Sequence, residues 1–198
     1  MDDPNQISLH DVLHNSYSQD PNALTKNGFN YDQELSNHNQ QVYYNPKQNK
    51  LLYSIAGTHN LNDIGTDIYL GLGKIKDTNR YKSADDTLTK AKQKYQPANT
   101  VVVGHSLGGN IASKIGKPED KIITYNKGST INEKVIPQEK SYRSNGDLVS
   151  IFNSTNNNTT TLKNKKYLLP VLPTFSSLAK NGYKRHLTNN LKNENIFI

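Results

Sequence analysis

The sequence predicts an α/β fold, with a central and mostly parallel sheet that is flanked by helices and preceded by an N-terminal hairpin. Two apolar segments, 41–45 and 50–57, lie on either side of a short segment with an Asn-Pro turn signal, as in a hairpin. The apolar segment 100–104 runs directly into residues with helical spacing. Strands that alternate with helices in this way are typical of βαβ units in a parallel sheet.

A helix is predicted over residues 83–95, after the hairpin. Ser83 can cap its N-terminus, and Pro97 lies just beyond its end. The apolar side chains that share one face of this helix are those of Ala84, Leu88, Ala91 and Tyr95. A helix with one apolar face is therefore expected between the hairpin and the next strand.

The second half of the chain continues the alternation. A helix begins near Leu107, because Leu107, Ile111 and Ile115 recur at helical spacing after the apolar strand. Segments 121–126 and 140–144 are two further strand candidates. These elements complete the predicted parallel sheet.

The composition indicates one domain over residues 1–198, with a compact core and long polar loops. Only 33% of the residues are hydrophobic, and the Asn- and Thr-rich segment 153–161 is predicted to be an exposed loop. The absence of cysteine excludes disulfides and cysteine-ligated metals, and no cofactor is expected. The acidic, polar start does not resemble a secretory signal, and no apolar run reaches the roughly 20 residues that cross a bilayer. We therefore expect a soluble protein that is made in a cytosol.

The excess of positive charge lies near the C-terminus. Residues 161–198 hold seven basic residues and one acidic residue, a net charge of +6 in a chain whose total is +7. Such a segment can favour nucleic acid or an anionic membrane surface. It has no aromatic-basic platform or helical recognition motif, so nucleic acid is not expected. An anionic membrane surface is the predicted partner, and a solvated loop face is the alternative.

Ser106 is the candidate nucleophile. It lies in the stretch Gly-His-Ser-Leu-Gly of residues 104–108, between a predicted strand and a predicted helix. In a nucleophile elbow the serine occupies a tight strand-to-helix turn, which lifts its hydroxyl above the sheet. Glycines flank it because a Cβ at those positions would collide with neighbouring backbone. The alternative is an ordinary glycine turn that happens to contain a serine.

A nucleophilic serine of this kind needs a histidine as its base and a carboxylate that orients the histidine. The order along the chain in this architecture is Ser, then Asp or Glu, then His, and only His186 follows Ser106. Asp147 follows segment 140–144 and should lie at the same edge of the sheet as Ser106, whereas Asp120 precedes a strand and should lie at the opposite edge. The alternatives are a surface histidine and an ordinary turn aspartate.

The oxyanion that forms in ester hydrolysis needs two hydrogen-bond donors. One is expected to be the backbone N–H of Leu107, the residue after the nucleophile. The second should come from the loop that follows an earlier strand, and residues 57–59 form such a loop. Thr58 can supply both a backbone N–H and a hydroxyl donor.

Together these residues resemble the class 3 lipases, the fungal triacylglycerol lipase type with an α/β-hydrolase fold. The resemblance spans residues 40–190 approximately. It rests on five features: Ala-Gly-Thr at 56–58, the acids Asp63 and Asp67, Gly-His-Ser-Leu-Gly-Gly at 104–109, Arg-Ser-Asn-Gly-Asp-Leu-Val at 143–149, and a late histidine. It implies a carboxylic ester hydrolase that acts on triacylglycerol or phospholipid.

The resemblance also implies a role for each candidate residue. Ser106, Asp147 and His186 would form the catalytic triad, and Thr58 and Leu107 the oxyanion hole. Two alternatives remain open: an esterase for small soluble esters, and a catalytically inactive hydrolase fold that serves as a structural or binding protein. The high Asn and Lys content would suit an AT-rich genome such as a viral one, so a virion component is one expectation.

Residues 68–82 contain several apolar side chains in an otherwise polar chain. In the lipases that the chain resembles, this region carries a lid over the acyl groove. Gly71 and Gly73 would allow a short flap to move. The alternative is that the segment is buried in the core.

Overall fold

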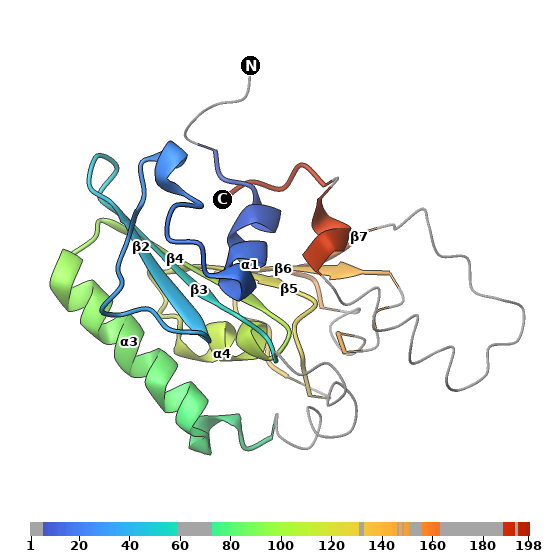
Figure 1. The fold of residues 1–198 in the computed structure, drawn as a ribbon. Coiled ribbons are helices and arrows are strands. Elements are labelled where there is room, and N and C mark those ends of the chain that lie inside the picture. The colour runs from blue at the N-terminus through green and yellow to red at the C-terminus, as the bar shows by residue number, and fades with distance from the viewer. Residues whose placement is uncertain are drawn as a thin grey trace, which may run out of the picture.

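The computed structural model describes residues 6–58, 73–130, 133–145, 147, 149–150, 156–162, 188–192 and 194–198. Within these residues one sheet contains seven strands, which lie side by side in their sequence order (Figure 1). The strands are β1 (Asn30–Tyr31), β2 (Gln40–Asn45), β3 (Lys50–Ile55), β4 (Asn99–His105), β5 (Lys121–Tyr125), β6 (Glu139–Ser144) and β7 (Thr159–Leu162). The α-helices are α1 (Leu9–Ser18), α3 (Asn79–Tyr95) and α4 (Leu107–Ile115), and the 3-10 helices are η1 (Thr25–Asn27), η3 (Ile75–Asp77) and η5 (Thr188–Leu191).

The predicted hairpin and the mostly parallel sheet are both confirmed. Strand β2 pairs antiparallel with β1 and with β3, whereas β3 to β7 pair in parallel. All five parallel strands therefore end at the same edge of the sheet, which we call the carboxyl edge. The opposite edge, where these strands begin, is the amino edge.

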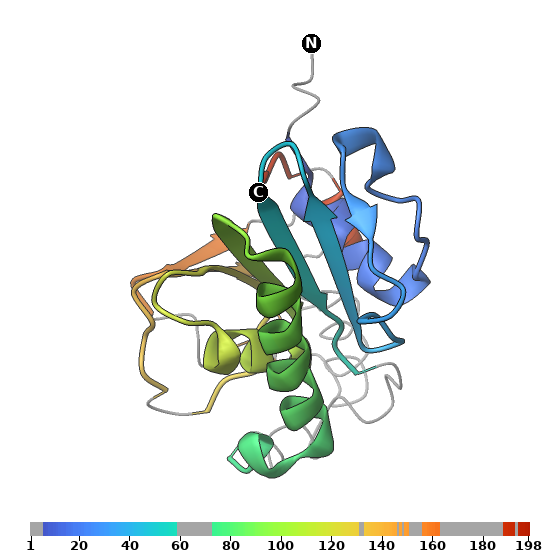
Figure 2. The same ribbon diagram turned by 90° about the vertical axis from the view of Figure 1, so that its left-hand side faces the viewer.

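Helices cover both faces of the sheet. Helix α1 and η5 lie on one face, and α3 and α4 lie on the other (Figure 1 and Figure 2). Because side chains alternate along a strand, Val101 and Val103 of β4 face the α1 layer, and Val102 faces the layer of α3 and α4. Each layer has its own buried apolar cluster. This two-layered packing explains why three successive valines of β4, Val101, Val102 and Val103, are all buried.

Helix α3 begins four residues earlier than the sequence predicts. Thr78 is its N-cap, and its Oγ1 accepts a hydrogen bond from the Tyr81 backbone N–H at 3.2 Å. The predicted cap, Ser83, lies inside the helix and is exposed. Serine and threonine are both favourable N-cap residues. The helix begins about one turn before Ser83, so Thr78 takes the N-cap position. The longer helix includes Arg80, which contacts the candidate site.

Helix α1 and strand β7 are among the elements that were not predicted. Helix α1 buries Leu9, Val12 and Leu13 against the sheet. Strand β7 pairs with β6 and begins inside segment 153–161, so the prediction of a loop is wrong for residues 159–161. Threonine is β-branched and favours strands. The side chain of Leu162, the last residue of this outermost strand, is buried.

The described part of segment 68–82 contains one fully buried apolar side chain. Ile75 is 3% exposed and belongs to the core cluster beneath α3 and α4. Ile75 is therefore core, as the alternative to a lid predicts, and residues 68–72 lie outside the described residues. In the part of the chain that the structure describes, no helix combines the length and apolar character needed to cross a bilayer.

Candidate active site

Ser106 lies on a strained turn between β4 and α4. Its backbone has φ 56° and ψ −122°, a region that residues with a side chain rarely occupy. Strand β4 ends at His105 and α4 begins at Leu107, so the serine alone makes the turn. This is the strand-turn-helix geometry of a nucleophile elbow.

The glycines on either side of Ser106 are required by close backbone contacts. A Cβ on Gly104 would stand 2.4 Å from the carbonyl oxygen of Gly108. A Cβ on Gly108 would stand 2.3 Å from the carbonyl oxygens of both Ile55 and Ala56. Because real Cβ atoms do not approach backbone so closely, only glycine lets α4 start this near to β3 and β4.

The Ser106 side chain is buried at the carboxyl edge. It is 2% exposed, and among the described residues its Oγ has no hydrogen-bond partner. A buried hydroxyl without a hydrogen bond costs about 1–3 kcal/mol, so most are satisfied. The unusual backbone and the unpartnered hydroxyl thus occur at the same residue.

The predicted oxyanion loop lies beside Ser106. Strand β3 pairs in parallel with β4, with Ile55 opposite Gly104, so Thr58 follows β3 at the edge where Ser106 follows β4. The Ser106 Cβ is 2.9 Å from the position that a Cβ on Gly57 would take. Leu107 is the first residue of α4, and the free N–H groups at the N-terminus of a helix stabilise a negative charge placed there.

Two residues that the sequence did not single out hold this loop. Tyr17 of α1 accepts a hydrogen bond from the Gly57 N–H at 2.7 Å, and its hydroxyl is 2.6 Å from His105 Nδ1. Arg80 of α3 donates to the carbonyl oxygens of Ala56 and, at 2.8 Å, Gly57. Because the Gly57 N–H already has a partner, Thr58 remains the better candidate for the second oxyanion donor.

Burial shifts the pKa of both supporting residues. The pKa of the Tyr17 phenol is raised well above its usual value, chiefly because burial disfavours the phenolate, so Tyr17 is neutral at physiological pH. Burial also lowers the pKa of Arg80, but the guanidinium stays protonated. The loop is therefore fixed by a neutral hydroxyl on one side and a cation on the other.

Asp147 is buried at the carboxyl edge, just after β6. Its Oδ2 accepts hydrogen bonds from the Ser150 N–H at 2.8 Å and from the Ser150 hydroxyl. Arg143 donates to the backbone oxygens of Asp147, at 3.1 Å, and Ser150, at 3.2 Å. Burial lowers the pKa of Arg143, and the charge of Asp147 opposes that shift. The turn therefore presents a carboxylate with a cation close by.

Asp120 lies at the amino edge, as the sequence predicts. It precedes β5, which runs parallel to β4, and its carboxylate contacts Lys92 Nζ at 2.7–2.8 Å. His186, Asp63 and Asp67 lie outside the described residues, as does the basic cluster Lys163, Lys165 and Lys166. The structure thus brings Ser106, Leu107 and Thr58 together and gives Asp147 the same edge of the sheet.

A buried ion pair supports the elbow from the side of β5. Lys127 follows β5 and donates to Glu139 Oε2 at 3.0 Å, while the Thr124 hydroxyl donates to Glu139 Oε1 at 2.8 Å. The next residue, Gly128, donates its N–H to the Ser106 carbonyl oxygen at 3.2 Å. The backbone of the candidate nucleophile is therefore hydrogen-bonded to the residue that follows a buried, ion-paired lysine.

Comparisons with known proteins agree with this fold. The family model described as Lipase (class 3) matches residues 29–115, which confirms the predicted resemblance. The structure of the Lip2 lipase from Yarrowia lipolytica superposes with a TM-score of 0.51 and 16% identity, over 72% of this chain and 70% of that one. A structure described as a fungal lipase gives 0.50 and 15% identity, over 72% and 69%. At these identities the likeness shows a shared fold, the α/β-hydrolase fold.

The chain is shorter than some of the proteins that it resembles. It spans 60% of the Rhizomucor miehei lipase chain, with 72% of its own length matched, a TM-score of 0.48 and 12% identity. A search of curated proteins found no matching sequence.

Proposed function

We propose that the protein is a serine hydrolase that cleaves lipid esters through an acyl-enzyme, because residues 29–115 match the class 3 lipase family model. Ser106, Asp147 and His186 are its proposed triad, and Thr58 and Leu107 its proposed oxyanion hole. The observation that carries the proposal is Ser106 itself. Its strained strand-to-helix turn is the geometry of a nucleophile elbow. Its Oγ also has no hydrogen-bond partner among the described residues.

The proposed reaction has two steps. Ser106 Oγ attacks the ester carbonyl carbon while His186 takes its proton, and the tetrahedral oxyanion then expels the alcohol, which receives that proton from His186. Water next attacks the acyl-enzyme, giving a proton to His186, and the carboxylic acid leaves as Ser106 regains its proton. Asp147 would orient the imidazole and stabilise it while it is protonated.

The oxyanion would be held by backbone dipoles at the start of α4 and by the loop after β3. The Leu107 N–H is one proposed donor, and the Thr58 N–H or hydroxyl is the other. Tyr17 and Arg80 fix the backbone on the N-terminal side of Thr58, so they act as positioning residues. Removal of a single oxyanion donor typically lowers turnover by about 10²–10³-fold.

Replacing Asp147 by Asn is expected to lower kcat by about 10³–10⁴-fold, because an amide would favour the wrong tautomer of the histidine. Asp120→Asn is the matched control, because Asp120 is also buried and precedes a neighbouring parallel strand, yet lies at the amino edge. The control should lower stability through its ion pair with Lys92 and leave kcat nearly unchanged. Both variants should be assayed well below their melting temperatures. Equal losses of kcat would remove Asp147 from the triad.

A substrate series separates lipid hydrolysis from the esterase alternative. We expect kcat/KM to be higher for emulsified triacylglycerol or vesicular phospholipid than for a short, soluble ester, with Ser106→Ala as the blank. An anionic membrane surface is a further proposed partner, because residues 161–198 carry a net positive charge. Hydrolysis of the short ester alone would favour the small-ester esterase instead.

A further inference from the structure

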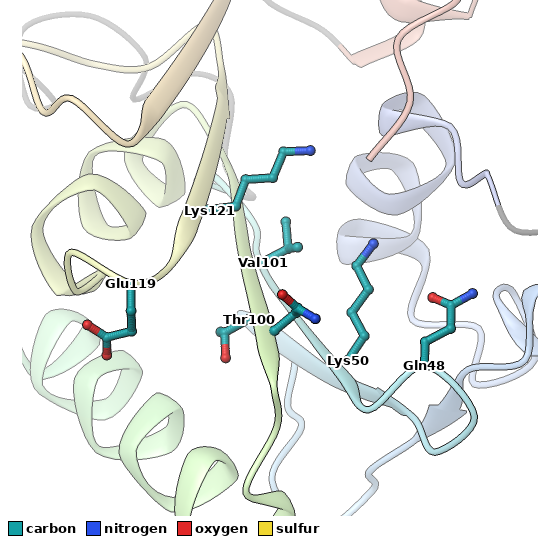
Figure 3. A pocket seen from close by; sticks show the side chains of 7 residues that line it. Gln48, Lys50, Thr100, Val101, Glu119 and Lys121 are labelled. Carbon is teal, nitrogen blue, oxygen red and sulfur yellow. The ribbon is translucent and has the colours of Figure 1, made fainter.

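A pocket of about 310 Å³ opens at the amino edge of the sheet, away from Ser106 (Figure 3). It is formed where β3, β4 and β5 begin, and its lining includes Lys50, Asn99 and Lys121, the first residues of these three strands. Ser106 follows the last residue of β4 and is seven residues from Asn99, or about 23 Å along an extended strand. The pocket is therefore separate from the candidate active site.

The two lysines of this pocket project to the same face of the sheet. Lys50 lies opposite Asn99, and Lys121 lies opposite Val101, so the strand register puts all four side chains on one face. Figure 3 shows the lysine side chains extending to the same side of β4, with Val101 between them. Asn99 and Gln48 add amide groups that can donate hydrogen bonds.

Lys50 differs from the other partly or fully buried lysines of the described residues. Lys92, Lys114 and Lys127 each contact a carboxylate oxygen within 3.1 Å. Neither Lys50 nor Lys121 makes an ion pair within the described ranges.

The acidic residue that lines this pocket, Glu119, pairs with a lysine outside the pocket. Glu119 lines the same pocket, but it contacts Lys92 at 3.0 Å, and Figure 3 shows it pointing away from the two lysines. Burial and, after it, the positive charge of Lys121 lower the pKa of Lys50. Two cations thus share one pocket at a cost that an anion between them would remove.

We propose that this pocket binds a phosphate group, held between Lys50 and Lys121 with the amides of Asn99 and Gln48 as further donors. A phosphate monoester carries a charge of about −1.5 to −2 at pH 7 and three acceptor oxygens, which match two ammonium groups and two amides. A carboxylate would neutralise only one of the lysines. The group could be soluble, as in inorganic phosphate or glycerol 3-phosphate, or it could be the headgroup of phosphatidic acid.

Calorimetric titration of the full chain with inorganic phosphate, at constant ionic strength, tests the site. We expect saturable binding, a melting temperature that rises with phosphate, and a Kd that rises at least about tenfold in Lys50→Gln and in Lys121→Gln. Lys90→Gln is the matched control, because Lys90 is an exposed lysine that pairs with Asp86 on α3. A Kd that is the same in wild type, both pocket variants and the control would overturn the proposal.

Two further arms identify the source of the phosphate group. Titration with glycerol 3-phosphate tests a soluble ligand, and sedimentation with phosphatidylcholine vesicles, with and without phosphatidic acid, tests a lipid headgroup. Binding that Lys50→Gln and Lys121→Gln weaken in either arm supports the pocket and names its ligand. Binding of inorganic phosphate alone names the free ion as the ligand, whereas binding that both variants retain, or no binding of any of the three probes, contradicts the pocket. Because both variants should keep normal reactivity at Ser106, failure here leaves the proposed hydrolase function untouched.

Discussion

Replacing Ser106 by Ala is expected to lower ester turnover by at least about 10⁴-fold, because loss of a serine nucleophile removes the acyl-enzyme route altogether. The fold should remain intact. Ser106 Oγ has no hydrogen-bond partner among the described residues, so the substitution breaks none of the described hydrogen bonds of its side chain. Turnover with several esters and the melting temperature should be measured on the same preparation.

Ser113→Ala is the matched control for this substitution. Ser113 is also 2% exposed and lies on α4, where its hydroxyl donates to the Gly109 carbonyl oxygen at 3.0 Å. Such a hydrogen bond back to the preceding turn adds little to helix stability. The control should therefore keep both its turnover and its fold. Near-normal turnover in Ser106→Ala would contradict the proposed mechanism.

Gly108→Ala should destabilise the protein by about 3 kcal/mol, which lowers the melting temperature by roughly 10 °C in a domain of this size. The added Cβ would stand 2.3 Å from two backbone oxygens at the end of β3. Backbone cannot rotate away as a side chain can, so α4 and the strand would have to move apart. That shift would also separate Leu107 from Thr58, and turnover should fall in the molecules that still fold.

Gly73→Ala provides the control for the glycine substitution. A Cβ on Gly73 would meet no atom within 4 Å, and its φ lies outside the region that favours glycine. We therefore expect an unchanged or slightly higher melting temperature in this variant, since alanine restricts the unfolded chain. If thermal denaturation gave equal melting temperatures for the two variants, the close contact at Gly108 would not exist as described.

The parts of the fold that sequence could predict are those with strong local signals. The hairpin 40–55 has a turn signal between two apolar runs, and β4 with α4 changes from a strand pattern to a helical one at a single serine. Strand β7 has a weak signal, because three threonines and one leucine resemble a polar loop until pairing with β6 is known. The contact with a neighbouring strand decides its structure.

The candidate site divides in the same way. Ser106 and Leu107 belong to one local motif, residues 104–108. The direction of the parallel strands is enough to put Asp147 at the carboxyl edge. Tyr17 of α1 and Arg80 of α3 contact Gly57 in the proposed oxyanion loop, from 40 and 23 residues away along the chain. Recognising the apolar spacing of Leu9, Val12 and Leu13 would have predicted α1, but not the contact of its tyrosine.

The nucleophilic role of Ser106 is tested most directly by labelling with a fluorophosphonate. After incubation of the full chain with the probe, digestion and mass spectrometry locate the modified residue. We expect one adduct, on the peptide that contains Ser106, with none in Ser106→Ala and an undiminished adduct in Ser113→Ala. No adduct on the wild-type protein, or an adduct on another residue that persists in Ser106→Ala, would contradict the proposed function.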